Sequence, residues 1–125
     1  MTRTTRRTRR ERGQVAIEYL GFVPLLLLVG LFAIQLGVAG YAINQAGTAA
    51  RVAARTASHD RPERTPEDAG QAAISDWLRN DTDLTPSWGP GQVTYKARIK
   101  IPSIVPGLDD GWLGTAERSS TMPRD

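Results

Sequence analysis

Glu18 is a carboxylate at the entrance of a long apolar run, which continues to Ile43. A carboxylate in or beside lipid is costly unless it reaches the headgroups or meets a positive partner. In one interpretation Glu18 extends to the headgroup layer beside Arg12. The other uses its spacing from Gly13: a cut after this glycine would free the α-amino group of Gln14, which would pair with Glu18 of a neighbouring chain. The residues alone leave both interpretations open.

No other group of residues has the composition of a catalytic or metal centre. His59 is the single histidine, and we expect it at the surface because a metal site needs further ligands at defined spacing. The stretch NDTD at 80–83 lacks the glycine and the final glutamate of a calcium loop. GPGQ at 89–92 lacks the lysine and hydroxyl pair of a phosphate loop. Since the chain also has no cysteine, we predict no catalytic residue, no cofactor and no metal.

The positive charge is concentrated at the start of the chain. Residues 1–13 carry six arginines and one glutamate, a net charge of +5, whereas the whole chain has +3, so the remainder has 3 − 5 = −2. An arginine-rich tail can bind nucleic acid, begin a signal sequence, or mark the cytoplasmic end of a membrane helix. Because this tail directly adjoins an apolar run, we expect a cytoplasmic leader over residues 1–13 and no nucleic acid.

The apolar run predicts one membrane-spanning helix. From Tyr19 to Ile43 it contains no ionisable group except tyrosines near its two ends, where aromatic rings favour the headgroup layer. Its length is about 37 Å, enough to cross a hydrocarbon core of about 30 Å. The arginines predict a cytoplasmic N-terminus, so residues 59–125 should lie outside the cytoplasm. The alternative is a secretory signal cut near Gly40, with a run about twice the usual length.

The same helix is predicted to extend beyond the membrane, over residues 14–58. Past Ile43, alanines recur at steps of three and four and form a narrow stripe on a helix. Small residues let helices approach closely, so we predict helix–helix packing through this surface. Pro24 removes one backbone donor and should kink the inner half of the helix. The residues assigned to packing are Ala33, Gly37, Ala46 and Ala50.

Residues 59–125 are predicted to form a small α+β domain. Thr65 and Pro66 are a typical helix start, a capping hydroxyl followed by proline at the first helical position. Two strands alone are marginal in water, so the second helix and the outer half of the long helix must cover one of their faces. The predicted elements are a helix from Pro66 to about Asn80, a loop over 80–91, and a β-hairpin of strands 92–101 and 115–122.

Several motifs occur together at the two ends of the chain. They are RGQVAIEYLGFVPLLLLVGLFAIQLG, then AARVAARTA after the membrane, and the closing KIPSIVPGL…LGTAERSSTMPRD. Together they resemble the TadE-like minor pseudopilins of the tight-adherence (Flp-type) pilus system. Gly13, Glu18 and Tyr19 fit the Gly-x-x-x-x-Glu-Tyr processing motif of prepilins, and Pro24 matches the family's usual proline. The middle of the chain is not covered by the resemblance.

The resemblance implies a type IV pilin-like precursor without enzymatic activity. A prepilin peptidase would cut between Gly13 and Gln14, and Glu18 would contact the new amino terminus of a neighbour, with Tyr19 and Pro24 in the same assembly segment. The expected partners are the bacterial inner membrane, the peptidase, other pilins or pseudopilins, and the assembly platform. An unprocessed single-pass anchor that displays a small adhesion or ligand-binding module is the alternative.

Overall fold

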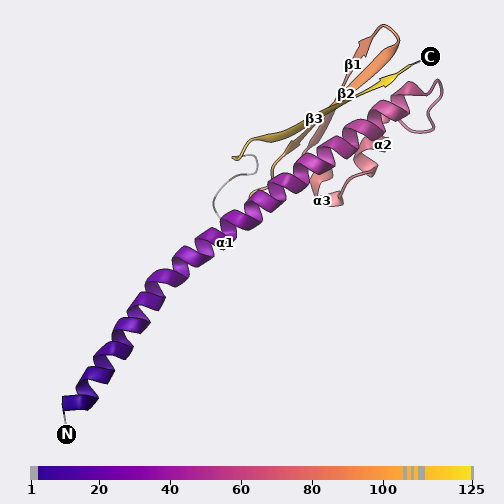
Figure 1. Cartoon of the computed structure of the whole chain (residues 1–125). Helices are drawn as coiled ribbons and strands as arrows, with labels where there is room; N and C mark the ends of the chain where they lie inside the picture. Colours follow the sequence, from indigo (N-terminus) through magenta and orange to yellow (C-terminus); the bar gives the residue numbers. More distant parts are fainter. Residues whose placement is uncertain (1–2, 106, 108, 110–111, 125) are drawn as a thin grey trace. The chain divides into compact units, whose positions relative to one another are not determined.

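The computed structural model describes residues 3–105, 107, 109 and 112–124, with side chains from Arg12 onward. It divides into two compact units, one up to Ile34 and one from Gln35. The fold is α+β, as predicted, with a long apolar helix, two short helices and one antiparallel sheet (Figure 1). The elements are α1 (Arg3–Ser58), α2 (Pro66–Ala72), α3 (Asp76–Arg79), β1 (Thr82–Gly89), β2 (Gln92–Lys100) and β3 (Thr115–Pro123).

The first unit contains only the N-terminal part of α1. Every residue from Arg12 to Gly30 is exposed, as expected of a helix whose apolar side chains surround its whole circumference. The helix begins at Arg3, so the predicted start at residue 14 was too late; the arginines of the leader favour a helix and no capping signal separates them from it. Their side chains before Arg12 lie outside the described residues. α1 continues without a break through Pro24 and Gly40.

The second unit contains a three-stranded antiparallel sheet with the order β1-β2-β3. The central strand β2 alternates between buried and exposed side chains, as its period of two predicts. β3 pairs with β2, which confirms the predicted second strand. Gly91 forms the tight β1–β2 turn with a φ of 69°, which glycine adopts without steric cost. The predicted turn between β2 and β3 includes residues 106, 108, 110 and 111, which lie outside the described residues.

Strand β1 corrects the prediction of a loop over 80–91. The whole strand pairs with β2, starting with Thr82 opposite Ile99. Most of its side chains are exposed, so the sequence lacks the apolar alternation that identifies a half-buried strand. Pro86 also argued against a strand, but proline is tolerated at a sheet edge, where its missing N–H faces away from the ladder. The predicted two-stranded hairpin is therefore a three-stranded sheet.

The second predicted helix is divided into α2 and α3. The start was correct: the Thr65 hydroxyl accepts a hydrogen bond from the Asp68 N–H at 3.2 Å. However, α2 ends at Ala72, and α3 begins only after Ser75. The Ser75 N–H donates to Oε1 of Gln45 on α1 at 3.1 Å instead of continuing a helix. Periodicity along one segment contains no information on such a bond to another element.

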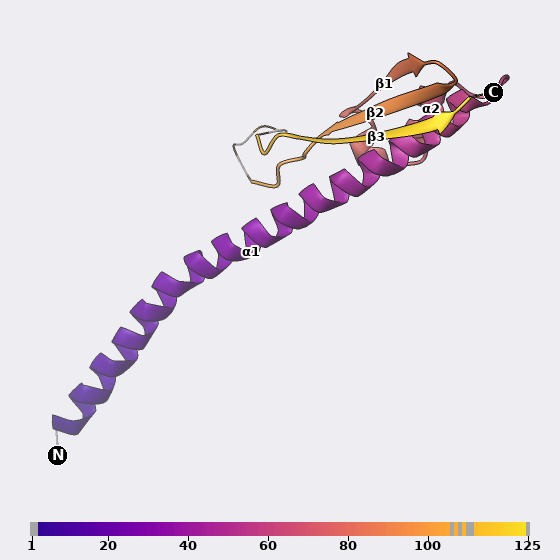
Figure 2. The same ribbon diagram turned by 45° about the horizontal axis from the view of Figure 1, so that its top comes forward.

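The core of the second unit lies between the C-terminal part of α1 and the sheet, which run alongside each other (Figure 2). Gly70 of α2 also approaches α1 closely: an added Cβ would lie 2.9 Å from the carbonyl oxygen of Ala49 and 2.6 Å from Leu84 Cδ1. Small side chains on α1 permit this close packing. Seven alanines of α1 are at most 5% exposed, namely Ala42, Ala46, Ala49, Ala50, Ala53, Ala54 and Ala57.

The positions of Ala46 and Ala50 correct the prediction that they pack against another helix of an assembly. Both are fully buried in their own chain, in the same cluster as Ala97 and Ile99 of β2. The alanine stripe does need a packing partner, and the sheet of the same chain is that partner. Ala33 and Gly37 are exposed, so for them association with another helix stays a prediction.

Candidate functional site

The residues assigned to processing and assembly lie on one exposed stretch of α1. Gln14 and Glu18 are four positions apart, so they lie on the same face of the helix. Neither lies within a core of the described chain, and the stretch is accessible to a protease or to another subunit. The exposed residues concerned are Gly13, Gln14, Glu18, Tyr19 and Pro24.

Glu18 is an ionisable residue in apolar surroundings. It lies in a shallow hollow on α1 whose other residues are Val15, Tyr19, Phe22, Val23 and Leu26. Within the described residues its carboxylate makes neither an ion pair nor a hydrogen bond. In or beside lipid, such a group needs a positive partner or access to the headgroups. The described part of the chain supplies no such partner.

Gly13 is not required to be glycine by the fold. A Cβ added at this position would have no neighbouring atom within 4 Å, and glycine in a helix costs about 1 kcal/mol relative to alanine. Gly21 has equally open surroundings. Gly70 is the opposite case, because its contacts with α1 exclude a side chain. Gly13 can therefore be substituted without disturbing the fold, and Gly21 is a matched control position.

Gln35 has a role that the sequence did not reveal. It is only 3% exposed, although it follows a run of exposed apolar residues. Its Nε2 donates to the Pro102 carbonyl at 2.8 Å, and its Oε1 accepts from the Ile104 N–H at 2.9 Å. Both ends of the amide are thus bonded to the segment after β2, which is 67 to 69 positions away. The signal was a single strongly polar residue inside the apolar run, but its partner was not evident.

Tyr41 also belongs to the second unit rather than only marking the end of a membrane segment. Its ring stacks on Trp77 with centroids 5.8 Å apart and planes 7° from parallel. Its hydroxyl is hydrogen-bonded to the Ser75 hydroxyl at the start of α3. These contacts attach the α2–α3 connection to α1. The sequence predicted Tyr41 at the headgroup layer from its position alone.

Two carboxylates of the second unit interact with β2. The Tyr95 hydroxyl donates to Glu67 Oε1 at 2.9 Å. Burial, and then the hydrogen bond and charge of Glu67, raise the pKa of Tyr95 to about 12. On the outer face, the hydrogen bond from Lys96, together with the charges of Lys96 and Arg98, lowers the pKa of Glu117, with 3.1 Å between the paired atoms in both contacts. Both interactions connect elements of the fold.

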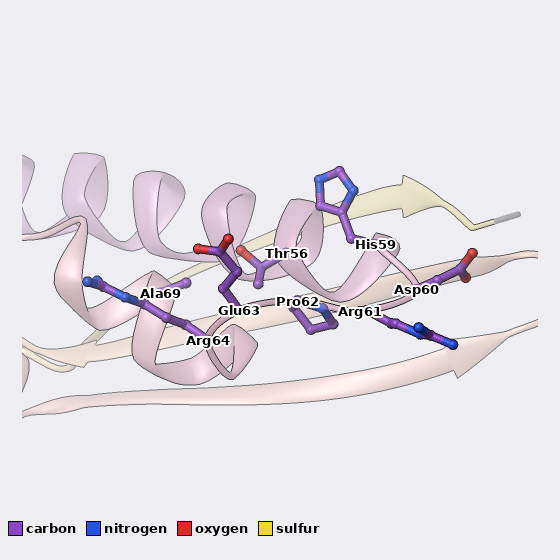
Figure 3. A pocket seen from close by; sticks show the side chains of 8 residues that line it. All are labelled: Thr56, His59, Asp60, Arg61, Pro62, Glu63, Arg64 and Ala69. Carbon is purple, nitrogen blue, oxygen red and sulfur yellow. The ribbon is translucent and has the colours of Figure 1, made fainter.

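A hollow of about 510 Å³ lies at the connection between α1 and α2. Its residues include His59, Glu63 and Arg64, all exposed. Figure 3 shows the His59 ring pointing away from the side chains of Glu63 and Arg64. In the part of the chain that the structure describes, no three His, Cys, Asp or Glu residues gather as a metal site. The surface position predicted for His59 is confirmed.

Comparison with known proteins gives one family match, which covers part of α1. The family described as TadE-like protein matches residues 13–55, and this is the family that the sequence motifs indicated. The matched range includes Gly13, Glu18 and Pro24 and ends within α1, before the sheet. No curated protein and no solved structure matches the chain. Among the described residues, α1 is the one helix long and apolar enough to cross a membrane.

Proposed function

We propose that this chain, a membrane-anchored protein with the TadE-like segment of the tight-adherence pilus system, is a minor pseudopilin. It would cross the inner membrane once, with its N-terminus in the cytoplasm and its sheet outside. Its role would be structural, and its partners would be a prepilin peptidase, other pilins or pseudopilins and the assembly platform. The observation that carries the proposal is the spacing of Gly13 and Glu18 on an exposed helix where Glu18 has no described partner.

Processing after Gly13 requires that the backbone leave the helix locally. Residues 12–30 are exposed, so opening the helix near Gly13 breaks local hydrogen bonds without disrupting a core. Glycine lowers the cost of opening, because its helix propensity is poor. A cut there also removes the arginines of residues 1–13, which have oriented the helix by that stage.

The cut would create the positive partner that Glu18 lacks. The new α-amino group of Gln14 has an ordinary pKa near 8 and is therefore mostly protonated at neutral pH. Two opposite charges attract strongly where little water screens them. Pairing Glu18 with the amine of a neighbouring subunit would remove two uncompensated charges from lipid together. Assembly of the processed chains would thus be favoured over assembly of the precursor.

Mass spectrometry of the chain from its native membrane tests the processing step. We expect a mature chain that begins at Gln14. In the Gly13→Ala variant we expect the precursor to accumulate, because the recognition motif is lost while the helix remains intact. The matched control is Gly21→Ala, which makes the same change on the same exposed helix and should be processed normally. A precursor that stays uncut in cells with an active prepilin peptidase would refute the proposal.

The assembly step needs a separate measurement. Glu18→Gln keeps the size of the side chain and removes its charge, so processing should continue while co-purification with other pilin subunits is lost. If this variant keeps both its location and its partners, the charge has no role in assembly. Normal assembly of an uncut chain would instead support the alternative, an unprocessed anchor that displays its sheet domain for adhesion or ligand binding.

A further inference from the structure

Gln35 is the first buried residue of α1 after the exposed apolar run, although apolar residues on another side of the helix, such as Leu36 at 66% and Ile43 at 42%, stay exposed beyond it. Residues from Val15 to Ile34 number about 20, which is the length that crosses a hydrocarbon core of about 30 Å. Gln35 then enters the second unit and is buried. A buried amide that is hydrogen-bonded through both its nitrogen and its oxygen suits the polar side of a membrane boundary, so the outer boundary is placed near Gln35. This boundary is closer to the N-terminus than the end of the apolar run at Ile43.

The hydrogen bonds of Gln35 hold the segment that follows β2 beside this residue. Because Gln35 binds Pro102 and Ile104 through both ends of its amide, the segment after β2 lies beside the residue that follows the apolar run. The two ends of the loop between β2 and β3 are joined by a hydrogen bond, in which the Ile101 N–H donates to the Gly114 carbonyl at 3.3 Å. Residues 102–104 therefore lie beside Gln35, the first residue of the second unit, and Trp112 is joined to them through its hydrogen bond to Ser103.

The described part of this loop contains four large apolar residues besides the exposed Asp109. Ile104 and Val105 are half-buried, Trp112 is 45% exposed and Leu113 is 38% exposed. The indole N–H of Trp112 donates to the Ser103 hydroxyl at 3.0 Å, so its polar atom is satisfied within the loop. A ring with a satisfied N–H and a large apolar surface is well suited to the boundary between headgroups and acyl chains.

The other two tryptophans are also exposed, Trp77 at 52% and Trp88 at 56%, but the ring of each contacts another side chain of the second unit. Trp77 stacks on Tyr41, and Trp88 lies under the Arg124 guanidinium, which is 4.9 Å from its ring centroid. Trp88 pairs with Val93 near the β1–β2 turn. Val93 belongs to the core cluster of Ala53 and Ala57, whereas Ala42 belongs to the other core cluster. Trp88 therefore lies at the opposite end of the sheet from the Gln35 segment.

We infer that residues 102–105 and 112–113 contact the outer surface of the lipid bilayer that α1 crosses, with Trp112 and Leu113 in the layer between headgroups and acyl chains. The contact gives the sheet domain a second attachment to the membrane besides α1. It also places Glu18, 17 positions before Gln35, about 25 Å from the outer boundary along the helix, near the inner edge of the core. The inference requires membrane anchoring and does not depend on processing.

Depth-dependent quenching of tryptophan fluorescence tests this inference. The full chain is reconstituted into phosphatidylcholine vesicles whose acyl chains carry bromine at either a shallow or a deep position. One variant, Trp77→Phe with Trp88→Phe, leaves Trp112 as its single tryptophan. The matched control, Trp77→Phe with Trp112→Phe, leaves Trp88. Iodide in the aqueous phase measures exposure to water in both variants.

We expect shallow bromines to quench Trp112 more than deep bromines do, and Trp112 to be shielded from iodide. Trp88 should be quenched by iodide and unaffected by either brominated lipid. Adding Gln35→Leu to the Trp112 variant should reduce the bromine quenching, because it removes the bonds that place the loop. If Trp112 behaves like Trp88, the inference is wrong. Shielding from iodide without bromine quenching would also overturn it, since this result indicates contact with another copy of the chain.

Discussion

The two halves of α1 use small residues in opposite ways. In the first unit, Gly13, Gly21 and Gly30 have open surroundings, and a Cβ at any of them would meet no atom within 4 Å. In the second unit, the alanines of α1 are buried under the sheet, and Gly70 has no space for a side chain. The backbone is one continuous helix throughout. What differs is whether the surroundings come from the chain itself or from outside it.

This difference shows why helical periodicity has a different meaning in each half. Up to Ile34 the large apolar residues cover all sides, which suits lipid because no face is distinguished. From Ala42 onward the small residues form one stripe, because a sheet packs closely against that side. A stripe of small residues beyond a membrane segment therefore need not mean association between helices of different chains.

The largest effect is expected from placing the same bulky side chain in each half. Ala50→Leu adds volume at a fully buried position, and overpacking a core typically costs about 1–3 kcal/mol. Ala33→Leu changes an exposed position and should alter stability by less than about 0.5 kcal/mol. Thermal unfolding of the detergent-solubilised chain, followed by near-ultraviolet circular dichroism, measures both variants.

When assembly is measured instead of stability, Ala33→Leu should have a larger effect than Ala50→Leu. If Ala33 and Gly37 pack against a neighbouring helix, Ala33→Leu lowers co-purification with pilin subunits while leaving the melting temperature unchanged. Equal melting temperatures for the Ala50 and Ala33 variants would contradict the burial of the alanine stripe.

The long helix and the central strand were predictable because each has a dense periodic signal. The apolar run and the alternation of β2 both extend over many residues, and local physics determines their structure. β1 and the interruption at Ser75 were not predictable in this way. β1 is stabilised by pairing with β2 despite Pro86, and Ser75 bonds to Gln45, which is 30 positions away.

The residues of the candidate site also differ in whether one segment of the sequence was enough to predict them. Gly13 and Glu18 were predicted from spacing within one segment, and their roles stay a prediction. Gln35 was visible as a polar residue in an apolar run, but its bonds to Pro102 and Ile104 depend on a distant loop. Ala46 and Ala50 were chosen for the correct reason, small size, and assigned the wrong partner, because the covering sheet was not yet known.

A smaller effect is expected from alkaline pH, and only in the second unit. The pKa of Tyr95 is raised to about 12 in the fold, above the usual value near 10. Its contribution to stability is therefore complete below pH 10 and is lost as the pH rises from about 10 to 12. At pH 11 the loss relative to pH 9 should be on the order of 1 kcal/mol. Chemical unfolding of the sheet domain in the solubilised chain at these two pH values measures it.

Tyr95→Phe is the matched control for this titration, since it keeps the buried ring and removes the ionisable hydroxyl. The variant should lose less stability between pH 9 and pH 11 than the unchanged chain. Helicity of the exposed half of α1 should not follow the same transition, because Tyr95 and Glu67 both lie in the second unit. An identical alkaline loss in both proteins would assign the effect to other groups.

The smallest effect is expected where the two halves meet, at Gln35. Gln35→Leu removes two hydrogen bonds to the half-buried segment at Pro102 and Ile104. The carbonyl and the N–H that lose their partner belong to half-buried residues, so the cost should be about 1 kcal/mol. Gln92→Leu makes the same change at an exposed position of β2 and is the matched control.

Because the loss is local, hydrogen exchange at the Ile104 amide is a more direct measurement than global unfolding. Faster exchange of this amide in Gln35→Leu, with rates on β2 unchanged, is the result expected if one side chain holds the loop beside Gln35. Unchanged exchange at Ile104 would mean that the loop is placed by its other contacts, and the boundary assigned to Gln35 would lose its physical basis.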